Sequence, residues 1–366
     1  MESEPINMTR EFIVLRKLRT PIMKKFVSLR ISLLFLLALG TVSSAFAETK
    51  SISSFKYIQM QKITVEGRAP IVTGLSLSGD GQTLVTVGDD HKARIWDVRD
   101  GHLIKTLEDQ KDWVRSVKFS PDGKVFVTGG MDDQLYCYDA GTHQRIMQFE
   151  SADTSIRSIA FSPQDSARMA VVGFDASVYI YDTQIGRKMR SWDTSCTDQR
   201  CVSFSADSRY VAAAGRDGNI RLFDMATGRI VDDLRGHTRR VWALGFSEDG
   251  KYLATGGEDR KVCIWSMETR QLLKQYEFPS GKVSAITFCG PDLVAAGSTN
   301  DKICVWDLRS NTDEPAYIMD EHHGTVAELL WDNVSQTLIS CSFDTTVRFW
   351  RWQTPNTAVS EIPTIR

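Results

Sequence analysis

Two groups of residues carry the side chains that nucleophilic catalysis uses, and each group ends on a tryptophan. In chain order they are His237, Thr255, Asp259 and Trp265, followed by His322, Ser340, Asp344 and Trp350. An imidazole, a hydroxyl and a carboxylate in contact form the triad of a hydrolase. The spacings of the two groups are identical, however, which indicates one structural unit that occurs twice, with the indole N–H holding the hydroxyl in place. We therefore predict a structural role and no catalytic residues.

Other residue patterns that bind metals or phosphates are missing from the sequence. No pair among the six histidines has metal-ligand spacing with a cysteine or carboxylate that recurs. No glycine-rich motif has the spacing of a phosphate-binding loop. We therefore expect no metal, no cofactor and no nucleotide site.

The seven cysteines fall into two sets. Five lie in or beside predicted strands, where cysteine acts as a small buried apolar side chain. The other two, Cys196 and Cys201, flank a short loop. In an exported protein these two could form a local disulfide, and the alternative is that all seven thiols are free.

Composition and charge narrow the class of protein. Of the 366 residues, 42% are hydrophobic and 25% are charged, which is ordinary for a globular protein. Lys and Arg number 44 against 46 Asp and Glu, giving a net charge of −2, and the acidic excess is larger after residue 47. This balance argues against a nucleic-acid-binding protein with a wide basic surface.

Residues 1–47 have the composition of a targeting segment. From Met23 the chain has a basic stretch, an apolar run, and small residues at Ala45 and Ala47, which is the pattern of a secretory signal peptide. We expect cleavage after Ala47 and a periplasmic or secreted protein without a membrane span. One alternative is a retained anchor, although the apolar run is shorter than the roughly 20 residues that cross a bilayer. Another is that translation starts at Met23 and not at Met1.

A unit of about 42 residues repeats seven times between residues 57 and 352. An aromatic residue marks each unit, and these residues are Trp96, Tyr138, Tyr181, Phe223, Trp265, Trp306 and Trp350. Six residues before each of them stands an Asp or, once, an Asn: Asp90, Asp132, Asp175, Asp217, Asp259, Asn300 and Asp344. Two fixed spacings in seven copies indicate one structural element used seven times.

The repeat closely resembles the WD-repeat family, of the bacterial exported type, over almost the whole chain after the leader. The resemblance implies an all-β fold, a seven-bladed WD-repeat β-propeller with four-stranded blades. Each unit would form one sheet with two apolar faces, which cannot fold alone and is buried by stacking on its neighbours. The run from Val262 to Trp265 has no polar alternation, as expected of a strand covered on both faces.

We expect four segments: the leader 1–47, a linker 48–56, the propeller 57–352 and a tail 353–366. Residues 101–107 form the outer strand before the second blade, and 42 residues earlier stands a similar segment, residues 59–65. That segment has no blade of its own to complete. We therefore predict that it pairs beside the strand ending at Trp350 and closes the ring, which removes open sheet edges. The tail could compete for the same edge.

In the family, a Trp, a Ser or Thr, a His and an Asp of one blade form a buried hydrogen-bond chain. The resemblance assigns that role to the two four-residue groups described first. The slot of the histidine holds Gln110, Ala152 and Pro279 in three other blades. We expect those blades to be less rigid.

The family usually binds partners on the face that carries the loops between strands d and a and between strands b and c. The positions of this chain that would project there gather arginines and large apolar side chains, although the chain is acidic overall. The predicted partner-binding residues are Trp113, Arg115, Met131, Arg157, Phe174, Arg200, Arg216, Arg240, Trp242 and Phe343. Arg and Trp dominate binding hot spots, and the Arg fork fits carboxylates. We expect an acidic, partly aromatic peptide or protein segment as partner; the alternative is that the arginines only solvate a surface or pair with Asp198 and Glu258.

The resemblance thus implies a non-catalytic protein-interaction scaffold that is monomeric within a larger complex and binds no nucleic acid. Two alternatives belong to other classes. A propeller hydrolase or lyase would need carboxylates and histidines that converge at one mouth of the central channel. A cytoplasmic assembly factor would follow if the leader were not processed.

Overall fold

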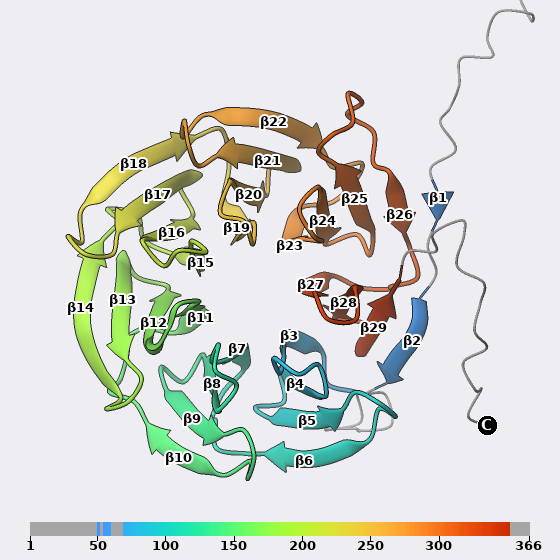
Figure 1. The fold of residues 1–366 in the computed structure, drawn as a ribbon. Coiled ribbons are helices and arrows are strands. Elements are labelled where there is room, and N and C mark those ends of the chain that lie inside the picture. The colour runs from blue at the N-terminus through green and yellow to red at the C-terminus, as the bar shows by residue number, and fades with distance from the viewer. Residues whose placement is uncertain (1–49, 52–53, 60–68, 352–366) are drawn as a thin grey trace, which may run out of the picture. The chain divides into compact units, whose positions relative to one another are not determined.

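Short runs of β-branched and aromatic residues, separated by turns rich in Gly, Asp and Ser, form 29 strands in the described part of the chain. The structure, a computed structural model, describes residues 50–51, 54–59 and 69–351. Figure 1 shows the strands gathered into seven sheets around a central axis. The prediction of a seven-bladed all-β propeller is confirmed. The leader 1–47 and the tail 353–366 lie outside the described residues.

Each blade begins with the strand nearest the axis. Blade 1 holds β3 (Val72–Leu77), β4 (Thr83–Gly88), β5 (Ala93–Asp97) and β6 (Leu103–Leu107). Blade 2 holds β7 (Val114–Phe119), β8 (Val125–Gly130), β9 (Leu135–Asp139) and β10 (Arg145–Gln148). Blade 3 holds β11 (Ile156–Ser162), β12 (Asp165–Gly173), β13 (Ser177–Asp182) and β14 (Arg187–Asp193). Blade 4 holds β15 (Gln199–Phe204), β16 (Tyr210–Gly215), β17 (Asn219–Asp224) and β18 (Ile230–Arg235).

The other three blades follow the same order. Blade 5 holds β19 (Val241–Phe246), β20 (Tyr252–Gly257), β21 (Lys261–Ser266) and β22 (Leu272–Glu277). Blade 6 holds β23 (Val283–Phe288), β24 (Leu293–Ser298), β25 (Ile303–Asp307) and β26 (Tyr317–Met319), and blade 7 holds β27 (Val326–Asp332), β28 (Thr337–Ser342) and β29 (Thr346–Trp350). Two N-terminal strands, β1 (Lys50–Ser51) and β2 (Ser54–Gln59), complete blades 6 and 7.

The ring is closed by an N-terminal strand, as predicted, but the described residues of this strand begin earlier than predicted. Strand β2 pairs antiparallel with β29, with Ser54 opposite Trp350 and Gln59 opposite Thr346 (Figure 1). The closing strand in the described residues is therefore 54–59, and the expected linker 48–56 is partly strand. Of the predicted segment 59–65, only Gln59 lies within the described residues. The sequence separation differs: β2 ends 13 residues before β3 begins, whereas β6 ends 7 residues before β7 begins. Counting back one repeat therefore overshot the strand.

One blade differs from the predicted four-stranded form. Strand β1 adds a fifth strand to the outer edge of blade 6, where it runs parallel to β26 with Lys50 opposite Tyr317. The N-terminal segment thus covers the outer edges of both blades at the seam of the ring. Covered edges offer no unpaired main-chain groups to another chain.

The inside of the ring also ties its ends together. Glu328 on β27 of blade 7 accepts a hydrogen bond from the main-chain N–H of Leu75 in blade 1, at 2.8 Å. The same carboxylate forms an ion pair with Lys118 in blade 2. One side chain therefore links the last blade to the first two.

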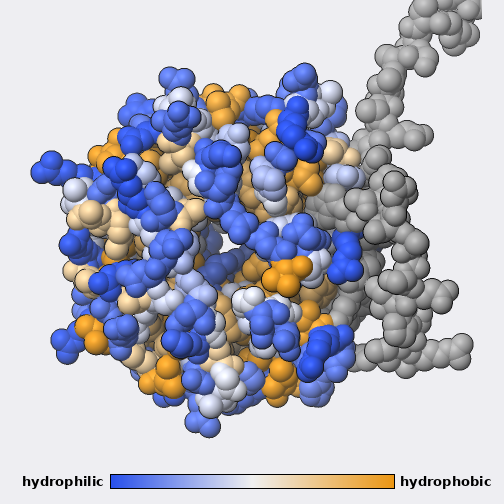
Figure 2. Space-filling model, in the orientation of Figure 1, coloured by the Kyte–Doolittle hydropathy of each residue, from blue (hydrophilic) through white to orange (hydrophobic). Residues whose placement is uncertain are grey.

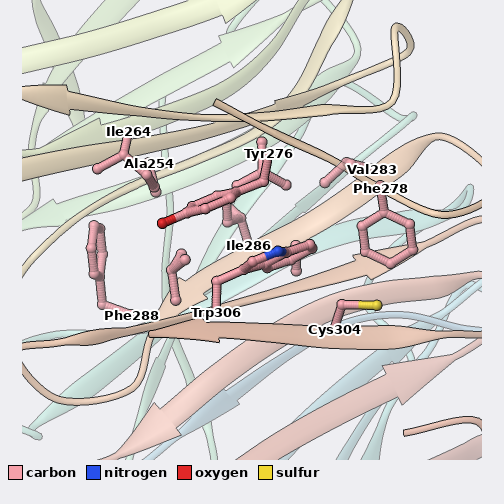
Figure 3. Packing of buried hydrophobic residues seen from close by; sticks show 12 residues of the cluster. Ala254, Ile264, Tyr276, Phe278, Val283, Ile286, Phe288, Cys304 and Trp306 are labelled. Atoms are coloured by element: carbon pink, nitrogen blue, oxygen red, sulfur yellow. The ribbon is translucent and has the colours of Figure 1, made fainter. Parts of the chain in front are cut away.

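The core lies between blades and not within them. Each of the seven buried apolar clusters draws its residues from two neighbouring blades. Figure 3 shows the cluster between blades 5 and 6, where the Tyr276 and Trp306 rings stack with centroids 5.4 Å apart and Phe278 meets Trp306 edge-on at 5.8 Å. Burying one such side chain contributes on the order of 2 kcal/mol. A blade alone would lose this contribution, so the blades are stable only as a ring.

Candidate protein-binding site at the channel mouth

A cavity of about 850 Å³ lies on the axis of the ring. All seven innermost strands contribute to its lining. Figure 2 shows an opening at the axis that is bordered mainly by hydrophilic side chains. The cavity has the size of a ligand pocket and opens to solvent.

A bulge recurs at the same place in every innermost strand. The pairing register shifts between the first and third residues of these strands, so the second residue has no partner. A bulge turns the side chain of the extra residue in a new direction. These residues are Thr73, Arg115, Arg157, Arg200, Trp242, Ser284 and Ala327, and all seven line the cavity.

In several blades the second strand ends on a glycine, which lets the segment that enters the innermost strand pack closely against it. A Cβ on Gly130 would lie 2.2 Å from the main-chain oxygen of Trp113, and a Cβ on Gly215 would lie 2.2 Å from that of Asp198. Any side chain there would push away the loop that enters the innermost strand. The glycines therefore hold the entry loops against the blade and place the bulged residue at the mouth.

Arginines and aromatic rings alternate along blades 2–5. The guanidinium of Arg157 lies 5.0 Å from the Phe174 ring centroid, and that of Arg200 lies 5.0 Å from the same centroid and 4.7 Å from that of Trp242. The guanidinium of Arg240 also stacks on the Trp242 ring, 5.5 Å from its centroid. We call blades 2–5 of the mouth the arginine half, defined by Trp113, Arg115, Arg157, Phe174, Arg200, Arg240 and Trp242. Blades 6, 7 and 1 form the small half, defined by Ser284, Ala327 and Thr73.

The acidic counter-charges reach only part of the arginine half. Asp198 lies 2.5 Å from Arg200 and 3.0 Å from Arg240, so one carboxylate serves two guanidiniums. Among the described residues, Arg115 and Arg157 have neither a hydrogen bond nor an ion pair through their side chains. Of the four arginines in the arginine half, Arg200 and Arg240 thus pair with an acid, as the alternative expects, and Arg115 and Arg157 do not. Glu258 pairs with Lys282 and not with an arginine.

Burial and like charge act on these two arginines. Burial, followed by the positive charges of Arg200 and Arg115, lowers the pKa of Arg157 to about 9, although Asp198 acts in the opposite direction. Burial and Arg200 also lower the pKa of Arg115, against the opposing effect of Asp89 and Asp112. The structure therefore holds two partly buried cations on neighbouring strands, and neither forms an ion pair with the described residues, although carboxylates lie near enough to act on both.

The cavity lining contains six of the ten predicted partner-binding residues. They are Trp113, Arg115, Arg157, Arg200, Trp242 and Phe343. Phe174 and Arg240 lie outside the lining but stack on it. Met131 is half-buried, and its main-chain N–H donates to the Trp113 oxygen at 2.8 Å. Arg216 is exposed and is not part of the lining.

Two charged residues of the lining escaped sequence reasoning. Lys118 and Glu328 belong to innermost strands of blades 2 and 7 and form an ion pair across the seam. The sequence feature that could have identified Lys118 and Glu328 is a charged residue within a strand whose other residues are mostly apolar. The lining contains no histidine, and Glu328 is its one carboxylate among the described residues, so no pair of acids converges there as a hydrolase would need.

The two four-residue groups that resemble a triad form buried hydrogen-bond chains. In blade 5, His237 Nδ1 lies 3.0 Å from Asp259, His237 Nε2 lies 2.9 Å from Thr255 Oγ1, and the Trp265 indole N–H donates to the same hydroxyl at 2.9 Å. Thr255 is fully buried, so its hydroxyl cannot reach a substrate. The indole holds the hydroxyl in place, which is a structural use of these residues.

Blade 7 repeats this arrangement at 2.7 Å from His322 to both Asp344 and Ser340, with the Trp350 indole N–H 2.8 Å from the Ser340 hydroxyl. Burial alone would raise the pKa of Asp344. Hydrogen bonds from His322, Thr346 and a main-chain N–H outweigh burial and hold that pKa well below its usual range.

Blade 2 has an equivalent chain that the sequence did not suggest. With the Gln110 amide oriented to satisfy both neighbours, its nitrogen donates to both Asp132 oxygens at 2.7 Å and its oxygen accepts from Thr128 Oγ1 at 3.2 Å. An amide carries a donor and an acceptor, as a neutral imidazole does. Gln110 therefore replaces the histidine, and the reason to expect a less rigid blade 2 disappears.

The suggested disulfide is not formed. Cys196 and Cys201 are both free and buried. The Cys196 thiol faces the main-chain oxygen of Thr197 at 3.3 Å, and the Cys201 thiol faces that of Ala214 at 3.6 Å. The two sulfurs thus have separate partners, and burial raises the pKa of both thiols.

Two further observations concern metals and membranes. In the described ranges, no group of three or more His, Cys, Asp or Glu side chains is placed to hold a metal ion. Within the same ranges, no helix has the length and apolar character that crossing a bilayer requires.

Two family models match the chain. The model described as nucleolar protein 10-like, N-terminal domain, matches residues 112–364, and the model described as WD domain, G-beta repeat, matches residues 60–97. No curated protein matches the chain. Propellers of these families are typically non-catalytic scaffolds for protein interaction.

The family match contradicts the predicted location. A family described as nucleolar conflicts with a periplasmic or secreted protein, so the prediction of export is wrong. The prediction of export came only from the composition of residues 23–47. The family match covers residues 112–364, which is most of the propeller, and is therefore the stronger evidence about location. The suggestion of a disulfide loses its basis as well, because it assumed an oxidising compartment.

The matched region of the first model begins just before β7 and runs through blades 2–7, while the second model covers the first three strands of blade 1. Together with the seven sheets and the hydrogen-bond chains of blades 2, 5 and 7, these matches show that the chain belongs to the nucleolar protein 10-like family of WD-repeat β-propellers.

Proposed function

We propose that the protein is a non-catalytic scaffold that binds an acidic, partly aromatic segment of a partner protein at the arginine half of the channel mouth. The observation that carries this proposal is the alternation of guanidiniums and rings from Arg157 to Arg240 with Asp198 as the shared counter-charge. Aromatic residues and Arg supply most of the binding free energy at protein interfaces. A carboxylate on the partner would add the missing negative charge.

Polar atoms without partners support the same site. The Nε atoms of Arg115 and Arg240 and the indole nitrogen of Trp242 are buried and have no hydrogen-bond acceptor among the described residues. A buried donor left unpaired costs roughly 1–3 kcal/mol. An acidic segment that offers carboxylate and main-chain oxygens would remove that cost on binding.

Apolar contact is available beside the charges. Phe174 is 39% exposed and Phe343 is 37% exposed, which is unusual for phenylalanine in a protein whose core is otherwise closed. An aromatic side chain of the partner would find a ring on either half of the mouth. Ring pairs of this kind contribute about 0.5–1.5 kcal/mol beyond burial.

We also propose that the protein acts in the nucleolus as an assembly factor. The support is the description of the matched family as nucleolar. A scaffold without catalytic residues contributes to assembly by holding partners together, and one acidic segment at the mouth leaves the rim of the propeller open for others.

The test compares affinity capture by the wild type with capture by a double variant, Arg115→Ala with Arg240→Ala. We expect the variant to lose the partners that the wild type retains. The matched control is Arg229→Ala, an exposed arginine in the connection between β17 and β18 of blade 4 that does not line the cavity. Thermal melting of each variant confirms that it folds. Unchanged capture by a folded double variant would refute the site.

A further inference from the structure

We propose that Arg115 and Arg157 bind the phosphate of a phosphorylated serine or threonine within the partner segment. This inference rests on the proposed function and names the group that the segment brings to the mouth. The two arginines occupy the same bulge position on neighbouring strands, β7 and β11, and both line the cavity.

The charge of the pair points to a dianion. Asp198 already lies against Arg200 and Arg240, while Arg115 and Arg157 have no acceptor among the described residues. A carboxylate carries one negative charge, so it leaves one of these two cations uncompensated. A phosphorylated side chain carries a charge of about −1.5 to −2 at pH 7 and compensates both.

The number of oxygens points the same way. A guanidinium presents two parallel N–H groups that a carboxylate fills completely, so one carboxylate suits one arginine. A phosphate offers three terminal oxygens, enough for two guanidiniums that approach from neighbouring strands. Both guanidiniums stack on rings, Arg115 on Trp113 at 4.5 Å and Arg157 on Phe174 at 5.0 Å, so their planes are held in place before a ligand arrives.

The opposite half leaves room and does not compete. Its bulged residues are Thr73, Ser284 and Ala327, all small. The hydroxyls of Thr73 and Ser284 donate to main-chain oxygens of the next blade. Glu328, the carboxylate of the lining, is engaged by Lys118 and by the Leu75 N–H. A phosphorylated side chain can therefore enter the cavity of about 850 Å³ without meeting an open carboxylate.

The lowered pKa of Arg157 is consistent with this arrangement. Burial and the neighbouring guanidiniums disfavour its charged form in the empty site. An anion that approaches both arginines removes the repulsion between them, so part of the binding free energy comes from relief of a pre-existing cost.

The experiment uses the full chain and three degenerate acidic peptide libraries, each with aromatic residues, that differ only in a central phosphoserine, glutamate or serine. Fluorescence anisotropy measures the dissociation constants. We expect the phosphoserine library to bind about tenfold tighter than the glutamate library. Arg157→Lys keeps the charge but loses the planar fork, so it should reduce this preference severalfold, whereas Arg229→Ala should leave it unchanged.

Each outcome decides between the two proposals. Equal affinity for the phosphoserine and glutamate libraries overturns the phosphate inference and leaves the acidic-segment site standing. Failure of all three libraries to bind overturns both. The inference is also overturned if single-stranded RNA displaces the bound phosphoserine library at a lower concentration than the unlabelled phosphoserine library does. Full displacement by inorganic phosphate at a concentration equal to that of the library overturns it as well. The comparison among libraries needs only the wild-type chain, so it stands even where a variant fails to fold.

Discussion

The two halves of the channel mouth share one backbone and differ in what their side chains do. Every innermost strand turns its second residue into the cavity by the same bulge. On the small half, the Thr73 and Ser284 hydroxyls bond to the next blade, at the main-chain oxygens of Val114 and Val326. On the arginine half, Arg157 at the same position has no such partner. The fold thus decides where the side chain points, and the residue type decides whether it bonds to the next blade or is left for the proposed partner segment.

This comparison also separates stability from binding. The small half contains the seam of the ring, with β2 and β1 on its outside and Glu328 on its inside. The arginine half contains the unpaired cations. We therefore expect changes in the small half to alter the free energy of unfolding, and changes in the arginine half to alter the affinity for partners.

The largest effect should follow from deleting residues 54–59, the closing strand. Blade 7 would keep three strands and an open edge, and the clusters at both ends of the ring would lose their support. We expect loss of the cooperative unfolding transition in thermal melting. The control removes residues 353–366, which should leave the transition intact. A sharp transition near the parent temperature after deletion of 54–59 would show that another segment closes the ring.

A smaller loss of stability should follow from His322→Ala in blade 7. The change leaves Asp344 and the Ser340 hydroxyl without their shared partner in a buried site, which costs about 2 kcal/mol or more. Urea denaturation measures the change. Affinity for the acidic libraries should stay the same, since neither chain reaches the mouth; altered affinity with wild-type stability would contradict the structural role.

The low pKa of Asp344 adds a pH dependence to this blade. Because the folded-state pKa lies below the ordinary value near 4, ionised Asp344 stabilises the fold at neutral pH, and the contribution is lost as pH falls from about 4 through the folded-state pKa. The destabilisation caused by Asp344→Asn should therefore be largest at pH 7 and shrink below pH 4. Urea denaturation at the two pH values checks it, and a constant difference would exclude this linkage.

Equivalent truncations in the two halves should have opposite signs. Ser284→Ala removes hydrogen bonds of 2.6 Å and 3.3 Å to main-chain oxygens and should lower the free energy of unfolding by about 1 kcal/mol without changing affinity. Arg157→Met removes a desolvated, repelled cation and keeps an apolar stem. It should raise the free energy of unfolding by up to about 1 kcal/mol while weakening binding. The same sign for both variants in urea denaturation would abolish the distinction between the halves.

The repeat made the ring and the position of the arginines predictable, because both depend on spacing along one chain. The repeat could not predict the side-chain contacts between blades. That Asp198 serves Arg240 of the next blade, or that Glu328 reaches Lys118 two blades on, depends on how sheets stack and not on any local pattern. The predicted position of the closing strand was wrong for a related reason, since a larger sequence separation between β2 and β3 shifts the strand without altering its own residues.

The smallest effect should come from adding an arginine to the small half with Ala327→Arg. Ala327 sits at the bulge of blade 7, lines the cavity and makes no side-chain hydrogen bond that the change would remove. A further guanidinium in the lining adds positive charge to the cavity, so affinity for the acidic libraries should rise about two- to threefold at low salt, and the gain should vanish near 0.5 M salt as screening increases. Anisotropy titrations at the two salt concentrations measure it. Ser284→Arg adds the same charge but removes a hydrogen bond to the next blade, so the increase in affinity should be smaller than for Ala327→Arg. A larger increase in affinity for Ser284→Arg would show that the small half does not stabilise the ring.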